Sequence, residues 1–187
     1  MKETFVIPQG HGESIPGTPF LQKILGSDTD GHFFLMEATM APRELVIPHT
    51  HTREDEFTFV YRGEIGARVG EQEVTVKAGS FLFKPRGIPH AMWNPTDEPA
   101  ILLEIIEPSG FEQFFVEMSK IPGGFHPANQ ARIDELATKY GHRFHSDVLK
   151  TVYTRAGGEL TDPQEGCKLR NIKIRSSGEQ PCLGVRL

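Results

Sequence analysis

Between His32 and Ile106 the chain consists of short runs of β-forming residues, and turns interrupt these runs too often for a helix to fit. The runs span residues 32–38, 44–49, 56–61, 65–69, 73–76, 80–83, 90–93 and 101–106. A parallel pair of strands needs a crossover of about a dozen residues or more, which none of these gaps provides. The spacing therefore predicts an all-β barrel or jelly roll.

The segments on either side of this region have different patterns. Residues 1–30 contain scattered glycine and proline and one short apolar stretch, Phe20–Leu25, so we expect an irregular arm with at most one short element. Residues 151–187 are polar and contain glycine, and they form a tail of uncertain structure.

Residues 109–150 change to the period of a helix. Four apolar residues would share one face of a first helix: Phe111, Phe114, Phe115 and Met118. A second stretch, Ala128–Tyr140, stops at Gly141, as helices often do. We expect both helices to pack against the barrel.

The charge and hydropathy of the chain exclude two classes of partner. Twenty basic and 25 acidic residues give a net charge of -5, which leaves no excess of cations to bind nucleic acid. No apolar run approaches the roughly 20 residues that cross a bilayer, and the N-terminus lacks a signal-peptide pattern. We expect a cytoplasmic protein that binds neither nucleic acid nor membrane.

Four residues form the pattern that carries chemistry. His49 and His51 are two apart, so their imidazoles leave the same face of an extended strand. Glu56 has the wrong parity for that strand, but the charged segment 52–55 can form a turn that lets Glu56 open the next strand. His90 follows a turn and can begin a strand that faces the first two histidines. Three imidazoles and one carboxylate suit one divalent transition metal, either Fe, Mn, Ni, Co, Cu or Zn.

The remaining histidines are not part of such a ligand pattern. We interpret them as ordinary residues at the surface or at helix ends: His11, His32, His126, His142 and His145.

The substrate would lie beside the metal. Depending on the strand register, we expect Thr58, Phe83 and Met92 to bind it, and Val60 and Glu104 are further candidates to line the cavity. The aromatic residues that alternate with Glu56 and Thr58 would leave the opposite face: Phe57, Phe59 and Tyr61.

Two motifs in this region resemble those of the cupin family. The segment His49-Thr50-His51-Thr52-Arg53-Glu54-Asp55-Glu56, six further residues and Gly63 resemble the first motif. Gly79, five residues, Pro85-Arg86-Gly87, two residues, His90, three residues and Asn94 resemble the second.

The resemblance implies a single cupin domain over residues 1–187, a double-stranded β-helix with its barrel core at 31–108. It also implies that His49, His51, Glu56 and His90 bind the metal. Glu54 is an alternative carboxylate, although only Glu56 has the six-residue gap to Gly63. Arg43 stands where the family often has a glycine, which alters a turn and affects no metal ligand.

A weaker resemblance concerns activity. The barrel followed by the segment 110–115 is similar to quercetinase-like (flavonol dioxygenase-like) bacterial cupins. This implies a metal-dependent dioxygenase that acts on a small hydroxylated aromatic or enolic molecule, with Glu56 as the catalytic base, in a homodimer. The alternatives are a metal-dependent isomerase or lyase, and a non-catalytic protein that binds a small ligand.

Overall fold

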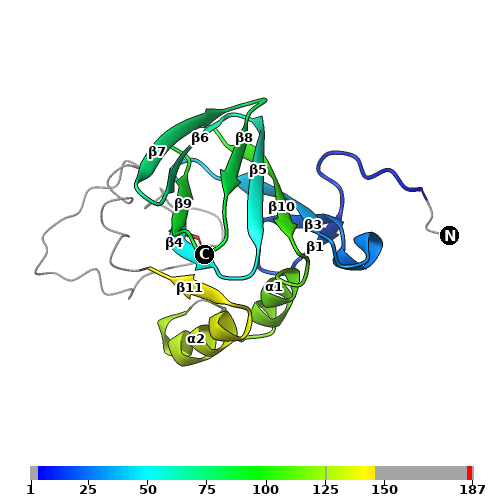
Figure 1. Cartoon of the computed structure of the whole chain (residues 1–187), viewed down its shortest axis with the longest axis vertical. Coiled ribbons are helices and arrows are strands. Elements are labelled where there is room, and N and C mark those ends of the chain that lie inside the picture. The colour runs from blue at the N-terminus through cyan, green and yellow to red at the C-terminus, as the bar shows by residue number, and fades with distance from the viewer. Residues whose placement is uncertain (1–3, 125, 146–184, 187) are drawn as a thin grey trace, which may run out of the picture.

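A computed structural model describes residues 4–124, 126–145 and 185–186. Two β-sheets face each other and form a barrel, and two helices cover one end of it (Figure 1). The first sheet has the spatial order β1 (Glu13–Ser14), β2 (Phe20–Ile24), β3 (Phe34–Met40), β10 (Ala100–Glu107), β5 (Asp55–Arg62) and β8 (Phe81–Lys84). The second has the order β11 (His142–Phe144), β4 (Leu45–His51), β9 (His90–Trp93), β6 (Glu64–Val69) and β7 (Gln72–Lys77), and β12 (Val185–Arg186) pairs with β4. Each of the predicted strands is present.

Alternating burial shows which side chains enter the barrel. Along β5, residues 56, 58 and 60 are buried while the residues between them are partly exposed. On β10, which pairs with β5, residues 102, 104 and 106 are buried in the same way. Opposed residues of an antiparallel pair share one face, so both strands send a continuous row of side chains inward. Val60 of β5 and Ala100 and Leu102 of β10 join the barrel core. The other buried residues of that core come from neighbouring strands: Ala38, Met40, Ile65, Ala67, Val76 and Met92.

The helices form a second core below the barrel. α1 (Glu112–Ser119) buries the predicted apolar face, together with Phe111 just before it. α2 (Gln130–Lys139) contributes Ile133, Leu136 and Ala137 to the same cluster. The predicted helices are therefore present, and the open end of the barrel is sealed by aromatic and aliphatic side chains. Short 3₁₀ turns precede β3 and α2, at Gly26–Thr29 and Pro127–Asn129.

Gly141 turns the chain from α2 back into a sheet. Its φ of +67° is a conformation that residues with a Cβ rarely adopt, and a Cβ there would approach Oγ1 of Thr52 to 2.5 Å. The amide of Thr52 donates a hydrogen bond to the carbonyl of Gly141 (2.8 Å), which ties the turn to the end of β4. The residues that follow form β11 rather than the end of a helical segment.

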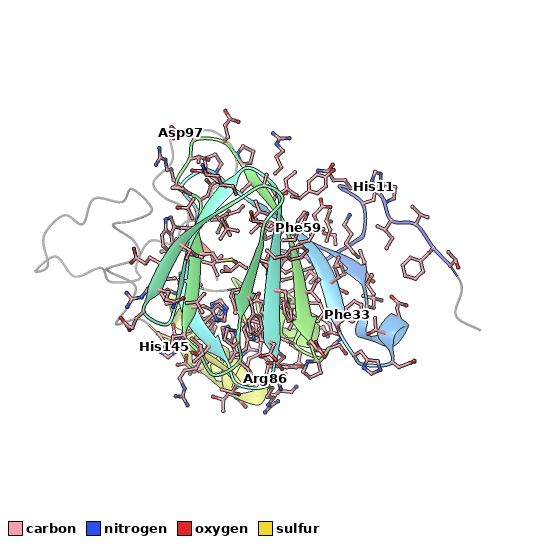
Figure 2. All side chains as sticks on the ribbon, turned by 45° about the horizontal axis from the view of Figure 1, so that its top comes forward. His11, Phe33, Phe59, Arg86, Asp97 and His145 are labelled. Carbon is pink, nitrogen blue, oxygen red and sulfur yellow. The ribbon has the colours of Figure 1, made fainter. Side chains whose placement is uncertain are left out.

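The N-terminal arm is partly sheet. β2 pairs with β3 of the same chain, while the side chains of Phe5 and Val6 are exposed. Arg43 adopts a φ of +58°, so the turn keeps the left-handed geometry that a glycine would favour. Its side chain pairs with Asp97 at 3.0 Å, at the barrel end opposite to Arg86 (Figure 2).

The predicted tail lies mostly outside the described residues, which omit 146–184 and 187. Neither helix in the described part of the chain has the length and apolar character needed to span a bilayer.

Candidate metal centre

β4 and β9 position the three histidines of the centre. His49 lies directly opposite His90 in the antiparallel pair. An extra residue on β4 between Val46 and His49 forms a bulge, so these two residues face the same cavity although they are three apart. His51 follows at the next inward position. All three imidazoles are buried, with at most 8% of each residue exposed.

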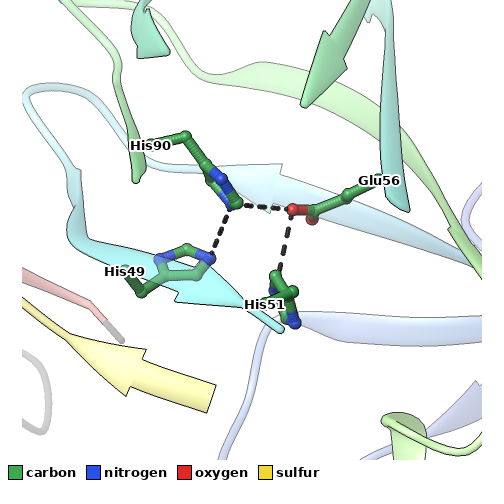
Figure 3. A group of neighbouring side chains, drawn as sticks. All are labelled: His49, His51, Glu56 and His90. Carbon is green, nitrogen blue, oxygen red and sulfur yellow. Dashed lines mark hydrogen bonds and ion pairs between the residues drawn. The ribbon is translucent and has the colours of Figure 1, made fainter. Parts of the chain in front are cut away.

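The four predicted residues converge on one point. Nε2 of His49 lies 3.1 Å from Nε2 of His90. Oε2 of Glu56 lies 3.1 Å from Nε2 of His90 and 3.7 Å from Nε2 of His51 (Figure 3). One ligand atom from each of the four residues lies within 4.8 Å of the others. The structure thus brings together the histidines and the carboxylate that the sequence selected.

The hydrogen bonds of the outer ring nitrogens determine what faces the centre. Nδ1 of His49 donates to the carbonyl of Ile47 (2.7 Å), and Nδ1 of His90 donates to the carbonyl of Ile88 (3.1 Å). A carbonyl can only accept, so in the neutral imidazole Nε2 carries the lone pair. Burial, followed by the neighbouring imidazoles, holds the pKa of His49 well below its usual value, and burial also lowers that of His90. Both rings are therefore neutral near pH 7.

This arrangement fits a bound cation. Two imidazole lone pairs and an ionised carboxylate oxygen face one another at 3.1 Å, and none of these three atoms has a hydrogen to donate. Acceptors at this distance repel unless a positive charge lies between them. A divalent metal held by His49, His51, Glu56 and His90 would remove that repulsion, and nitrogen and oxygen donors of this kind suit the transition metals.

Glu54 and Glu56 lie on different sides of His51. Oε2 of Glu54 is 3.6 Å from Nδ1, the outer nitrogen of the ring, whereas Glu56 faces Nε2. The geometry therefore places Glu56 in the group of four and puts Glu54 behind the ring. A carboxylate in this second position orients a metal-binding imidazole in many proteins.

Lys84 is a member of the site that the sequence did not predict. It lies opposite Glu56 in the β5–β8 pair and is only 1% exposed. Its Nζ is 3.1 Å from Oε1 of Glu56 and 3.1 Å from Oε2 of Glu104. Glu104 also accepts a hydrogen bond from Oγ1 of Thr58 (2.9 Å). One ammonium group thus bridges two buried carboxylates.

The protonation of this cluster follows from its charges. Burial opposes ionisation of Glu56, but the charge of Lys84 overcomes that cost and holds the pKa of Glu56 well below its ordinary value. Burial raises the pKa of Glu104 to about 8, because Lys84 offsets only part of the cost and the charge of Glu56 adds to it. Burial opposes the charge of Lys84 as well, yet the two carboxylates raise its pKa. Near pH 7 the cluster therefore holds a charged lysine, an ionised Glu56 and a protonated Glu104.

A cavity of about 70 Å³ lies beside the four residues, between the barrel core and the helices. Its wall is mainly apolar, from Phe20, Met36, Ala38, Met40, Val46, Met92, Leu102, Ile106, Phe111, Phe114, Phe115 and Phe144. The polar residues at the wall include Glu56, Glu104, His49, His51 and His142. Met92 lines this cavity, whereas Thr58 is fully buried, donates a hydrogen bond to Glu104 and is not part of the wall. Contact of Met92 with a substrate stays a prediction.

Phe83 does not fit its predicted place. It lies opposite Phe57 in the β5–β8 pair, so both rings leave the outer face of the sheet, where they stack with centroids 4.9 Å apart. Phe83 is 51% exposed. The inward position next to it belongs to Lys84, and the expectation that Phe83 contacts a substrate in this cavity is therefore withdrawn.

His142 was interpreted as a surface or helix-end residue, and the structure places it in the site. It pairs with His51 across β11 and β4, is 8% exposed and lines the cavity. Its ring centroid lies 4.7 Å from that of His49 and 5.0 Å from that of His51. The available signal was the alternation of His142 and Phe144 directly after Gly141, which is the pattern of a strand.

Comparison with known proteins agrees with this fold. Residues 36–106 match the family model described as a cupin domain. The tetracenomycin polyketide synthase protein TcmJ of Streptomyces glaucescens is 32% identical over 75 residues, which cover 40% of this chain and 50% of that protein. The chain thus matches only half the length of this curated relative.

Two solved structures are similar in shape. KdgF from Halomonas sp. aligns with a TM-score of 0.50 and 14% identity, over 59% of this chain and 98% of that one. An uncharacterized conserved protein with a double-stranded β-helix domain from Klebsiella pneumoniae aligns with a TM-score of 0.49 and 18% identity, over 58% of this chain and 93% of that one. The predicted cupin-type β-barrel is confirmed as a fold, and the part of the chain that matches the cupin-domain model is residues 36–106.

Proposed function

We propose that this chain is a metal-dependent cupin enzyme of the quercetinase-like kind, a dioxygenase that acts on a small hydroxylated aromatic or enolic substrate. The observation that carries the proposal is the convergence of His49, His51, Glu56 and His90 on one point at the wall of an apolar cavity. The dioxygenase chemistry comes from the resemblance of the sequence, because a fold alone does not define a reaction.

The residues of the site have separate roles in this proposal. A divalent ion held by the four side chains would bind a substrate oxygen and make its hydroxyl group more acidic. Glu56 is ionised, and its Oε2 faces the cluster, so it accepts the proton from that hydroxyl. Lys84 holds Oε1 of the same carboxylate, which fixes the direction in which Oε2 points. The apolar wall excludes water from the reacting group.

The cavity also limits the class of substrate. Its volume of about 70 Å³ is far below the roughly 300–1,000 Å³ of typical ligand sites, which favours one ring or a shorter chain over a flavonol. Within the described residues, its wall contains no arginine or lysine that would pair with a carboxylate of the substrate. A neutral catechol-like or enolic molecule suits these walls better than an anion.

Oxygen consumption tests the dioxygenase. The protein is loaded in turn with Fe(II), Mn(II), Ni(II) or Co(II), mixed with quercetin or catechol without oxygen, and then exposed to oxygen in an electrode cell. We expect uptake with at least one combination, and a loss of about 100-fold or more in Glu56→Gln. Glu98→Gln, an exposed change of the same kind, controls for the loss of one charge. Absence of uptake with every metal and substrate removes the hypothesis.

One observation favours a second candidate, a metal-dependent isomerase or lyase. Such an enzyme needs a second acid or base near the ion, and Glu104 lines the same cavity with a pKa of about 8. Arg86 does not line this cavity and pairs with Asp55 near the surface. Deuterium exchange into hydroxyacetone under argon, followed by NMR, distinguishes the two functions. Exchange that Glu104→Gln abolishes would support the second candidate, and no exchange would leave the dioxygenase.

A further inference from the structure

His142 enters the site from a strand that lies beyond both helices. In the β11–β4 pair it is opposite His51, and Phe144 is opposite His49. Opposed residues share one face of a sheet, so His142 and the two histidines of β4 point into the same cavity. A hydrogen bond between Oγ1 of Thr50 and Nε2 of His145 (2.7 Å) fastens β11 to β4. The position of His142 is therefore built into the sheet.

The surroundings of His142 are aromatic. Its ring lies 5.3 Å from Phe111, 5.4 Å from Phe114 and 4.4 Å from Phe144, measured between ring centroids. A neutral imidazole offers one hydrogen-bond donor and one acceptor.

Nδ1 of His142 is buried and has no hydrogen-bond partner among the described residues. Leaving a buried polar nitrogen unpaired costs about 1–3 kcal/mol, and His142 lines the cavity, so a molecule bound there can supply the missing partner. His142 is not one of the four residues whose ligand atoms converge. It borders that group, in contact with the rings of His49 and His51.

We propose that His142 is a substrate-orienting residue, whose imidazole forms a hydrogen bond with an oxygen of the molecule bound beside the metal centre. This inference rests on the proposed function and adds a substrate class to it. A molecule with oxygens on two adjacent carbons, such as a catechol or an enediol, would place one oxygen at the centre and the other at His142. The apolar rings around His142 would cover the carbon skeleton.

The experiment uses cobalt(II) as a spectroscopic metal and 4-nitrocatechol as the probe. The visible spectrum of the cobalt protein reports coordination, and the absorbance of 4-nitrocatechol reports binding. We expect His142→Phe to bind one cobalt with an unchanged spectrum and to bind 4-nitrocatechol at least tenfold more weakly than the wild type. Arg143→Gln, at an exposed position of the same strand that does not line the cavity, controls for a change in β11 and should stay within threefold. His142→Asn keeps an amide near the position of Nδ1 and should recover most of the affinity.

Two further measurements make the result decisive. If His142→Phe does not fold, His142→Leu replaces it, and the ¹⁵N shifts of His142 in zinc-loaded wild type must move when catechol is added. Equal affinity of wild type and the apolar variant, or unmoved shifts, overturns the role of His142. Loss of cobalt from His142→Phe also overturns it, because His142 would then hold the metal. If the wild type binds no cobalt, the proposed function itself fails; if it binds cobalt and probe, only the role of His142 is at stake.

Discussion

The ammonium group of Lys84 lies 3.1 Å from Oε1 of Glu56, inside the barrel and on the side of the carboxylate that faces away from the imidazoles. The other oxygen, Oε2, lies 3.1 Å from Nε2 of His90. Lys84 therefore binds one oxygen of the carboxylate, Oε1, while the other oxygen, Oε2, faces the centre. It also links Glu56 to Glu104, so the charges on both sides of the cavity depend on each other.

Lys84→Met should strongly destabilise the metal-free protein. Removing one partner of a buried ion pair leaves uncompensated charge, here on the ionised Glu56, and typically costs about 3–5 kcal/mol. Urea unfolding measures the change, and Lys77→Met on the exposed side of β7 should cost far less. The double variant Lys84→Met/Glu104→Leu should recover part of the loss, because an apolar pair then replaces the bridge. A double variant whose loss equals the sum of the two single losses would show that Lys84 and Glu104 do not interact.

Glu104→Gln should change how stability depends on pH. The pKa of Glu104 is about 8 in the folded protein, above the ordinary value of 4.5, so the folded state retains a proton that the unfolded chain releases. The stability from this group is present below pH 4.5 and is lost as pH rises through 8, by about 1.4 kcal/mol per pH unit. The unfolding free energy of Glu104→Gln relative to wild type should therefore rise between pH 5 and 8. A constant difference, like that expected of Glu98→Gln, would contradict the raised pKa.

In the metal-free protein, His142→Phe should change how the free energy of unfolding depends on pH in the acidic range. The pKa of His142 lies well below 6.5 in the folded state, so below that pH the unfolded chain binds a proton that the folded protein does not. Wild-type stability from this group is present above 6.5 and falls with decreasing pH. The wild type should thus lose stability relative to His142→Phe between pH 6.5 and 5. Unfolding curves at several pH values test this, and parallel profiles would show that the folded protein binds the proton equally well.

The strands and the four central residues could be predicted from the sequence, and the reason is physical. Close turns and alternating residues are local properties, and His49 and His51 share a strand face whatever the rest of the chain does. Lys84 and Phe83 depend instead on which residue of β5 lies opposite each of them, and that register is a long-range property. A shift of one residue exchanges the two faces, which is why Phe83 was placed inward and Lys84 was overlooked.

The local pattern gave only a short signal for His142, the alternation of His142 and Phe144. The helical period before it ended at Gly141, and the following residues were too few to predict a strand that returns to β4. Pairing between segments so far apart in the chain is decided by the packing of α1 and α2 below the barrel. The site residues that lie in the two motifs could therefore be predicted from the sequence. His142, which comes from another segment, could not.

We expect two copies of this chain to associate through the outer face of the first sheet. The resemblance to cupins also implies a dimer. Phe81 is 67% and Phe83 51% exposed. Phe83 stacks on Phe57, and Phe81 packs at a tilt against Phe59. Exposed apolar patches of this kind often mark interfaces between proteins. We expect a dimer by light scattering, with Phe83→Glu shifting it toward monomer and Val74→Glu on the second sheet leaving it unchanged. A monomeric wild type at tens of micromolar would contradict this prediction.

The metal content of the protein tests the central claim most directly. Wild type and His90→Gln are purified side by side without a histidine tag or added metal, and elemental analysis measures the divalent ions per chain. The geometry of His49, His51, Glu56 and His90 predicts about one equivalent of a transition metal in the wild type and close to none in the variant. A wild type that holds no metal even after loading, or a variant that holds as much, would contradict the account.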